Sequence, residues 1–66
     1  MIRWYRNRTE SIVDAQSLLD AGRRPLIWKP AGQIDCVRGL TAEVEAHPIV
    51  QRFIAMQLVH YDAVYS

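Results

Sequence analysis

The sequence predicts a small α+β domain in which a short antiparallel sheet lies under two helices, in the two-layer order (β)αββα. Three observations predict it: apolar residues recur at helical spacing in residues 10–21 and 48–64, β-prone runs lie between these segments, and the chain has only 66 residues. A chain of this length forms one small core, so residues 1–66 are expected to be a single domain. The alternative is a mostly helical bundle with an irregular middle.

The chain is expected to begin with a short strand and to continue into a helix. Residues 2–7 alternate with a period of two and include aromatic side chains, which is typical of a strand. Thr9 or Ser11 supplies a helix N-cap, and Gly22 supplies a residue at which helices often stop. Because apolar residues follow helical spacing between them, the first helix is predicted over residues 10–21.

A β-hairpin is predicted next. Residues 26–28 form a short apolar run, and Pro30 and Gly32 in the segment that follows favour a turn. Residues 33–37 alternate again and are predicted to be the second strand of the hairpin. We expect Cys36 to be buried on the hairpin face under the helices, because free cysteines usually behave as small buried hydrophobes.

The C-terminal part is expected to be helical. Thr41 is a suitable N-cap for residues 41–46, and Pro48 interrupts that segment because it restricts the residue before it. Either a short turn precedes a helix that starts at Pro48, or one helix kinks there. Residues 48–64 carry the strongest helical pattern, so a long C-terminal helix is predicted.

The charges are nearly balanced but unevenly distributed. Eight basic and seven acidic residues leave a net charge of +1. Residues 1–38 hold seven of the basic and four of the acidic residues, a net of +3, whereas residues 39–66 hold a net of −2. The overall balance does not indicate a nucleic-acid-binding protein, but the N-terminal excess keeps that possibility open.

A reducing, cytoplasmic compartment is the expected location. The single cysteine excludes an intrachain disulfide, which a secreted chain of this size would usually need. The first residues lack the apolar run of a signal peptide. The longest apolar stretch, residues 49–65, is too short and too polar to cross a bilayer, so no membrane association is expected.

No motif for catalysis or metal binding is present. Metal-ligand spacings such as C-x-x-C and H-E-x-x-H, and nucleotide-binding glycine patterns, do not occur. Glu43 and His47 lie four residues apart, and Cys36 with His60 is a conceivable pair, but a salt bridge or cap and a buried core thiol are the simpler interpretations. We expect no enzyme activity, cofactor, metal or small-molecule substrate.

The predicted C-terminal helix suggests a protein interface. Its apolar side chains spread over more of the surface than one small sheet can cover, which favours a partner over core packing with a few exposed apolar residues. Gln57 and His60 would need hydrogen-bond partners there, and a two-fold homodimer through residues 50–64 would supply them. The predicted interface residues are Val50, Phe53, Ile54, Gln57, His60, Tyr61 and Val64.

The N-terminal segment offers a second interpretation. Arginines interleaved with aromatic residues can contact phosphates and stack on bases, although a core tryptophan among solvated arginines is the simpler interpretation. The candidate nucleic-acid contacts are Arg3, Trp4, Tyr5, Arg6, Arg8, Arg23, Arg24 and Lys29.

The function predicted from the sequence is that of a small non-enzymatic protein-binding module, an inhibitor, adaptor or assembly component. The alternative is a nucleic-acid-binding regulator. The length and predicted element order are similar in shape to those of small phage structural and anti-defence proteins, which implies a bacterial or phage setting, but no motif is shared.

Overall fold

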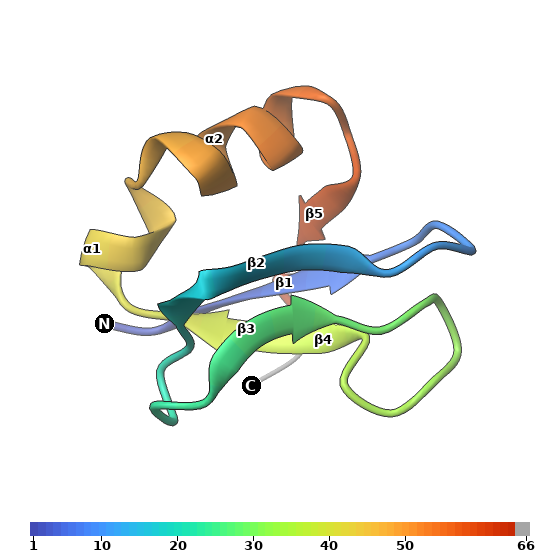
Figure 1. The fold of residues 1–66 in the computed structure, drawn as a ribbon, viewed down its shortest axis with the longest axis horizontal. Helices are drawn as coiled ribbons and strands as arrows, with labels where there is room; N and C mark the ends of the chain where they lie inside the picture. The colour runs from blue at the N-terminus through green and yellow to red at the C-terminus, as the bar shows by residue number, and fades with distance from the viewer. Residues whose placement is uncertain (65–66) are drawn as a thin grey trace.

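Five strands and two short helices make up residues 1–64, the part of the chain that the computed structural model describes (Figure 1). They are β1 (Arg3–Asn7), β2 (Val13–Leu19), β3 (Pro25–Trp28), β4 (Val37–Leu40), α1 (Ala42–Glu45), α2 (Pro48–Ala55) and β5 (Val59–Tyr61). One antiparallel sheet has the order β4-β1-β5, and β2 pairs with β3 in a second. The predicted (β)αββα order with a long C-terminal helix is therefore wrong, and so is the helical bundle.

The helix predicted over residues 10–21 is strand β2. Val13 and Ala15 are buried while Asp14 between them is exposed, which is the two-residue period of a strand with one buried face. Val13 lies opposite Trp28 of β3 in the antiparallel register. A bulge after Ala15 breaks the period, so apolar residues further along β2 fall at helical spacing without forming a helix.

The predicted hairpin between residues 26–28 and 33–37 does not form either. The first of these segments is a strand as predicted, but its partner is β2. Residues 29–35 form a closed loop before β4. Gly32 and Asp35 have positive φ within it, and the amide of Lys29 donates to the carbonyl of Asp35 at 3.0 Å. Cys36 is buried as predicted, but it lies in that loop instead of on a hairpin strand.

The C-terminal helix starts where predicted and ends nine residues earlier than predicted. The side chain of His47 accepts a hydrogen bond from the amide of Ile49 at 3.1 Å, and Pro48 occupies the first turn, so a separate helix begins there. Gln57 has a φ of 60° and stops the helix. The chain then turns back into β5, which pairs with β1.

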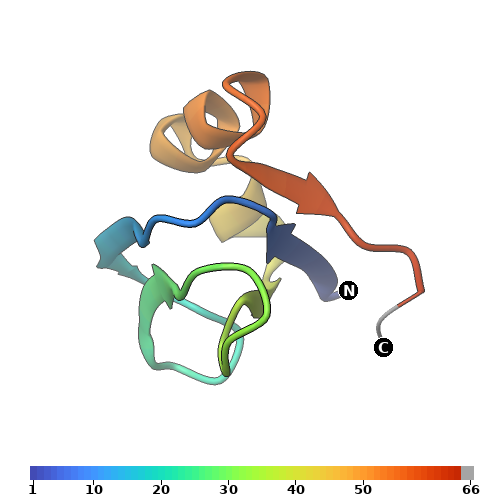
Figure 2. The same cartoon turned by 90° about the vertical axis from the view of Figure 1, so that its right-hand side faces the viewer.

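The core lies between the two sheets, and α2 covers the opening between β2 and β5 (Figure 2). The indole of Trp28 is fully buried and donates to the carbonyl of Tyr5 at 3.0 Å, which connects the two sheets. The buried apolar cluster consists of Tyr5, Val13, Ala15, Leu26, Trp28, Leu40, Val50 and Val59.

Asn7 is a buried polar residue whose side chain ties three segments together. Its amide group donates to the carbonyls of Ser11 at 2.8 Å and Lys29 at 3.0 Å, and its oxygen accepts from the amide of Thr9 at 2.8 Å. A buried amide is stable in a core only when its donors and acceptor are used, and here they are. Asn7 therefore fixes Lys29, the residue that follows β3, against the loop between β1 and β2.

Candidate functional site

The seven residues predicted to form a helical interface do not share one surface. Val50 is fully buried in the core, and Phe53 and Ile54 pack against that core from α2. The homodimer seam predicted along a helix over residues 50–64 therefore has no helix to support it, because α2 ends at Ala55.

The remaining predicted interface residues lie beyond α2. Gln57 is in the turn that ends α2, and His60 and Tyr61 are in β5. Tyr61 is 57% exposed and Val64 is 93% exposed. The ring of Tyr61 lies 5.8 Å from that of Tyr5, so it belongs to the surface over β1 and β5.

The predicted nucleic-acid contacts are mostly engaged within the chain. Three of the arginines form ion pairs with carboxylates. The pairs are Arg3–Glu45 at 3.5 Å, Arg6–Asp62 at 2.7 Å and Arg24–Asp35 at 2.8 Å. The hydroxyl of Tyr5 donates to Glu45, and its ring is buried. These side chains are therefore engaged within the chain, Arg3 and Arg24 in exposed ion pairs.

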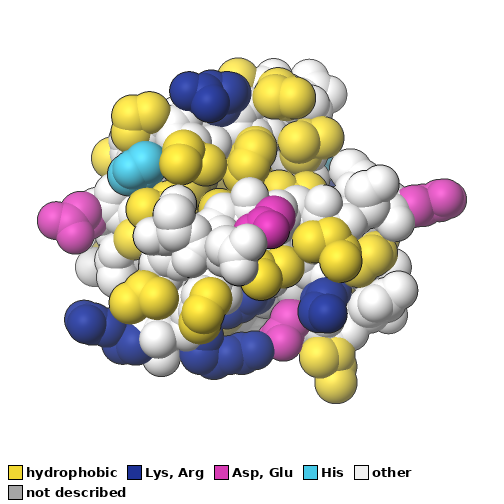
Figure 3. Space-filling view, in the orientation of Figure 1, with side chains coloured by type: hydrophobic (Ala, Val, Ile, Leu, Met, Phe, Trp, Pro, Cys, Tyr) yellow, Lys and Arg dark blue, Asp and Glu magenta, His cyan; other side chains and the backbone are white. Residues whose placement is uncertain are grey.

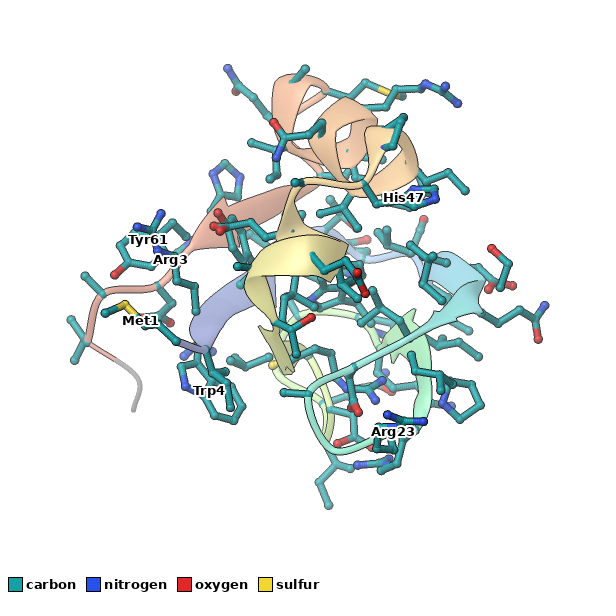
Figure 4. All side chains as sticks on the ribbon, turned by 90° about the vertical axis from the view of Figure 1, so that its left-hand side faces the viewer. Met1, Arg3, Trp4, Arg23, His47 and Tyr61 are labelled. Atoms are coloured by element: carbon teal, nitrogen blue, oxygen red, sulfur yellow. The ribbon has the colours of Figure 1, made fainter. Side chains whose placement is uncertain are left out.

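The other basic residues of that set are exposed but dispersed. Within residues 1–64, the ion pairs do not include Arg8, Arg23 or Lys29. In Figure 4, Arg23 lies apart from Arg3 and Trp4, which are neighbours along β1. The structure thus divides the predicted basic patch among several surfaces.

Trp4 and Arg24 are brought to one surface depression. The indole of Trp4 lies against Gly39 of β4, where an added Cβ would come within 2.9 Å of the ring. The depression has a volume of about 260 Å³ and is also lined by Asp20, Asp35 and Arg38 among others. Two of its charged groups, Arg24 and Asp35, bind one another, so the depression offers little free charge.

A second hollow lies on the outer face of the β2–β3 sheet. Leu26 and Trp28 of β3 point into the core, so Ile27 and Lys29, which alternate with them, belong to the opposite face. The hollow has a volume of about 420 Å³, within the range of small binding pockets. Its lining residues are Ile12, Asp14, Arg24, Pro25, Ile27, Lys29, Asp35 and Arg38.

Apolar and charged side chains alternate on this face, both along each strand and between the two strands. Asp14 lies opposite Ile27. Ile12 and Lys29 lie one residue beyond the next pair, Val13 and Trp28, and both line the hollow, so the alternation places them side by side on the same face. One diagonal of the four is therefore apolar and the other carries one negative and one positive charge. Figure 3 shows hydrophobic, basic and acidic side chains interleaved over the part of the surface where β2 and β3 run. We call these four residues, Ile12, Asp14, Ile27 and Lys29, the outer-face square.

A buried ion pair between Arg38, which lines the hollow, and Asp20 fixes the position of Arg38 there. Arg38 of β4 binds the carboxylate of Asp20 and also donates to the carbonyls of Ile27 and Pro25. Although burial opposes ionisation, hydrogen bonds from the amide of Arg24 and the guanidinium of Arg38 lower the pKa of Asp20. This pair is part of the scaffold, since each member is buried and already bound.

Asp35 closes one side of the hollow. Its carboxylate accepts from the guanidinium of Arg24 at 2.8 Å, and this contact lowers the pKa of Asp35. Of the charged groups around the hollow, Lys29 and Asp14 are the ones whose side chains have no ion-pair partner among residues 1–64. They are therefore the charges open to a bound molecule, although the carboxylate of Asp14 also accepts hydrogen bonds from the backbone amide of Gln16 at 2.9 Å and from its side-chain amide at 3.1 Å.

Sequence reasoning predicted Arg24 and Lys29 as binding residues but missed the rest of this face. Ile12 and Asp14 were assigned to a helix, and Ile27 to an apolar strand without a face. The two-residue alternation of apolar and polar side chains over residues 13–16 is the signal that would have placed Asp14 on the exposed face of a strand, whereas Ile12 precedes that alternation and gave no such signal.

Metal-binding clusters of three or more histidine, cysteine, aspartate or glutamate side chains do not occur in the described part of the chain. Across the same 64 residues, the helices are all too short to cross a membrane. No family model matches the chain, and neither the curated proteins nor the solved structures contain a significant match.

Proposed function

We propose that this chain is a small non-enzymatic protein-binding module whose docking face is the outer face of the β2–β3 sheet. The observation that carries the proposal is the hollow of about 420 Å³, in which apolar side chains of Ile12 and Ile27 adjoin the unpaired charges of Lys29 and Asp14. Apolar contact surrounded by a few charged groups is the usual composition of a protein-binding surface.

The chemistry of the lining favours binding over catalysis. The eight lining residues include no serine, threonine, cysteine, histidine or tyrosine, so the hollow has carboxylates and cations but no nucleophile of those types. Arg38 and Asp20 are bound to each other, and Arg24 holds Asp35. Groups fixed in this way stabilise a surface and are poorly placed to transfer protons.

The partner surface should carry the complementary pattern. An acidic side chain would meet Lys29, and a branched apolar or aromatic side chain beside it would cover Ile12 and Ile27. Charge pairs at such a rim contribute mainly to orientation and association rate, whereas the buried apolar contact contributes more of the affinity.

A matched pair of substitutions tests the proposal. Ile12 is 55% exposed in the hollow, and Met56 is 59% exposed at the end of α2. Ile12→Asp should abolish retention of a protein from a lysate of the source cells, whereas Met56→Asp should leave it unchanged. Both variants should unfold near the temperature of the parent chain, because both side chains lie largely in solvent.

The proposal fails if Ile12→Asp and Met56→Asp retain the same protein equally. Lysine and arginine substitutions give a second arm: Lys29→Gln should weaken retention, and Arg52→Gln, an exposed cation on α2, should not. These four variants distinguish binding at the docking face from nonspecific hydrophobic or electrostatic binding elsewhere on the surface.

The nucleic-acid alternative rests on the depression that joins Trp4 to Arg24. If it is correct, the retained material will be nuclease-sensitive, its binding will fall steeply with salt, and Trp4→Ala will reduce it more than Ile12→Asp does. The ion pairs of Arg3, Arg6 and Arg24 make this the weaker candidate.

A reducing, cytoplasmic location belongs to the same proposal. What supports it is the single cysteine, Cys36, which is a buried free thiol. Fractionation of the source cells, followed by immunodetection of the chain, tests the location.

A further inference from the structure

We infer that the docking face, if it is the one proposed above, is occupied by a second copy of this chain in a two-fold dimer built on the outer-face square. The inference rests on the proposed function and names the occupant. What points to a second copy is the charge pattern of the face, which is complementary to itself.

The symmetry of the square decides the geometry. A two-fold axis that runs along the apolar diagonal leaves Ile12 against Ile12 of the other copy and Ile27 against Ile27. The same rotation exchanges the two charged corners, so Lys29 of each copy meets Asp14 of the other. An axis parallel or perpendicular to the strands would instead set each charge over an isoleucine.

The rotation also fixes how the two sheets cross. After rotation about a diagonal, the strands of one copy cross those of the other at a large angle, as in orthogonally packed sheets. The spacing along a strand exceeds the spacing between strands, so the charged corners do not superpose fully. The long, flexible side chain of Lys29 spans that difference.

Apolar side chains at the rim are available to fill the hollows of the two copies. Ile12 lines the hollow, and Ile34, which precedes the lining residue Asp35, is 85% exposed. The square covers parts of two strands and one loop, less than the roughly 800 Å² per partner of a standard interface. We therefore expect a weak dimer, which must be measured up to about 1 mM.

Charge reversal across the square tests the inference. Sedimentation of the whole chain should show a dimer whose dissociation constant rises at least about tenfold in Asp14→Lys and in Lys29→Asp, since each puts two like-charge pairs in the interface. An equimolar mixture of the two variants should restore the dimer, because lysine then faces aspartate at both contacts. A chain with both changes should also dimerise.

A control removes general attraction between oppositely charged chains. Glu43→Lys and Arg52→Asp make the same charge changes on exposed residues of α1 and α2. Each should dimerise as the parent chain does, and mixing them should add nothing. Circular dichroism of every variant checks that it is folded.

Two results overturn the inference: a parent chain that is monomeric at 1 mM, or reversal variants that dimerise as tightly as the parent. The proposed function fails separately. If the mixture stays monomeric while Ile12→Asp still abolishes retention of a lysate protein, the occupant is a different protein and the docking face stands. If Ile12→Asp changes neither dimerisation nor retention, both are wrong.

Discussion

Tyr5 shows how a residue that resembles a nucleic-acid contact in the sequence can be a structural one. Its ring is buried in the core, and its hydroxyl donates to Glu45, which also lies 3.5 Å from Arg3. Burial and the hydrogen bond to Glu45 raise the pKa of Tyr5 to about 12. The phenol therefore keeps its proton in the folded chain at pH values where an unfolded tyrosine has lost it.

This difference predicts an alkaline loss of stability. Between pH 10 and 12 the unfolded chain releases the Tyr5 proton and the native chain retains it, so the free energy of unfolding falls as the pH rises. Tyr5→Phe should remove that part of the pH dependence and cost about 0.5–1.5 kcal/mol at neutral pH. Urea unfolding at pH 7, 10 and 11 measures both, with Tyr61→Phe as the control. An unchanged alkaline slope in Tyr5→Phe would refute the assignment.

At the scale of elements, the strand of residues 25–28, the capped short helix and the start of α2 could be predicted from local signals. Thr41 caps α1 by accepting from the amide of Val44 at 3.3 Å, and Pro48 starts α2. The same local signals did not predict strand β2. Its extended conformation depends on pairing with β3, where Val13 lies opposite Trp28, and a bulge disrupts its two-residue period. The candidate site was lost with it, since Ile12 and Asp14 come from that segment.

The end of α2 was also hidden from sequence reasoning. The amide of Leu58 donates to the carbonyl of Phe53 at 3.0 Å, and the amide of Gln57 donates to that of Ile54 at 2.9 Å. These two bonds, with Gln57 at positive φ, form a Schellman motif, and Leu58 and Phe53 both pack on the core as that motif favours. Glycine usually marks this position, and here glutamine occupies it, so the signal was absent.

Gln57→Gly should therefore stabilise the chain. Glycine adopts positive φ without the steric cost that a side chain incurs, so we expect a gain of about 1 kcal/mol and a rise in Tm of about 4–8 °C. Ala55→Gly, two residues earlier and at the last helical position of α2, should instead lower stability by about 0.5–1 kcal/mol. Thermal unfolding of both variants compares them, and equal destabilisation would show that the turn at Gln57 carries no strain.

At the scale of the whole molecule, one arginine joins the two sheets where no strand ladder does. Strands β3 and β4 are not paired, yet Arg38 of β4 donates to the carbonyls of Pro25 and Ile27 and binds Asp20. The amide of Ala21 donates to the carbonyl of Gly39 at 2.8 Å nearby. The relative position of the sheets thus depends in part on the buried charge of Arg38, whose ion-pair partner among residues 1–64 is Asp20.

Two asparagine substitutions separate this buried pair from an exposed one. Asp20→Asn should cost about 3–5 kcal/mol, because it leaves the guanidinium of Arg38 buried without a counter-charge. Asp35→Asn removes the exposed pair with Arg24 and should cost at most about 1 kcal/mol. Chemical denaturation at pH 7 gives both values. Similar losses in the two variants would contradict the role assigned to Arg38.

Acid should have the same effect as Asp20→Asn. Because the pKa of Asp20 is lowered in the folded chain, its contribution is present above the unfolded value and is lost as the pH falls through the folded value. The parent chain should therefore lose stability on acidification more steeply than Asp20→Asn, which has no carboxylate to protonate.

Strand β1 leads the chain but obtains both of its neighbours, β4 and β5, from later segments. During translation at 5–20 residues per second, roughly 3–12 s separate the synthesis of Arg3 from that of Tyr61. For that interval β5 is incomplete, so β1 keeps unpaired backbone groups along at least one side. A ribosome that stalls before residue 59 leaves this strand available to chaperones, to proteases or to the same strand of another stalled chain.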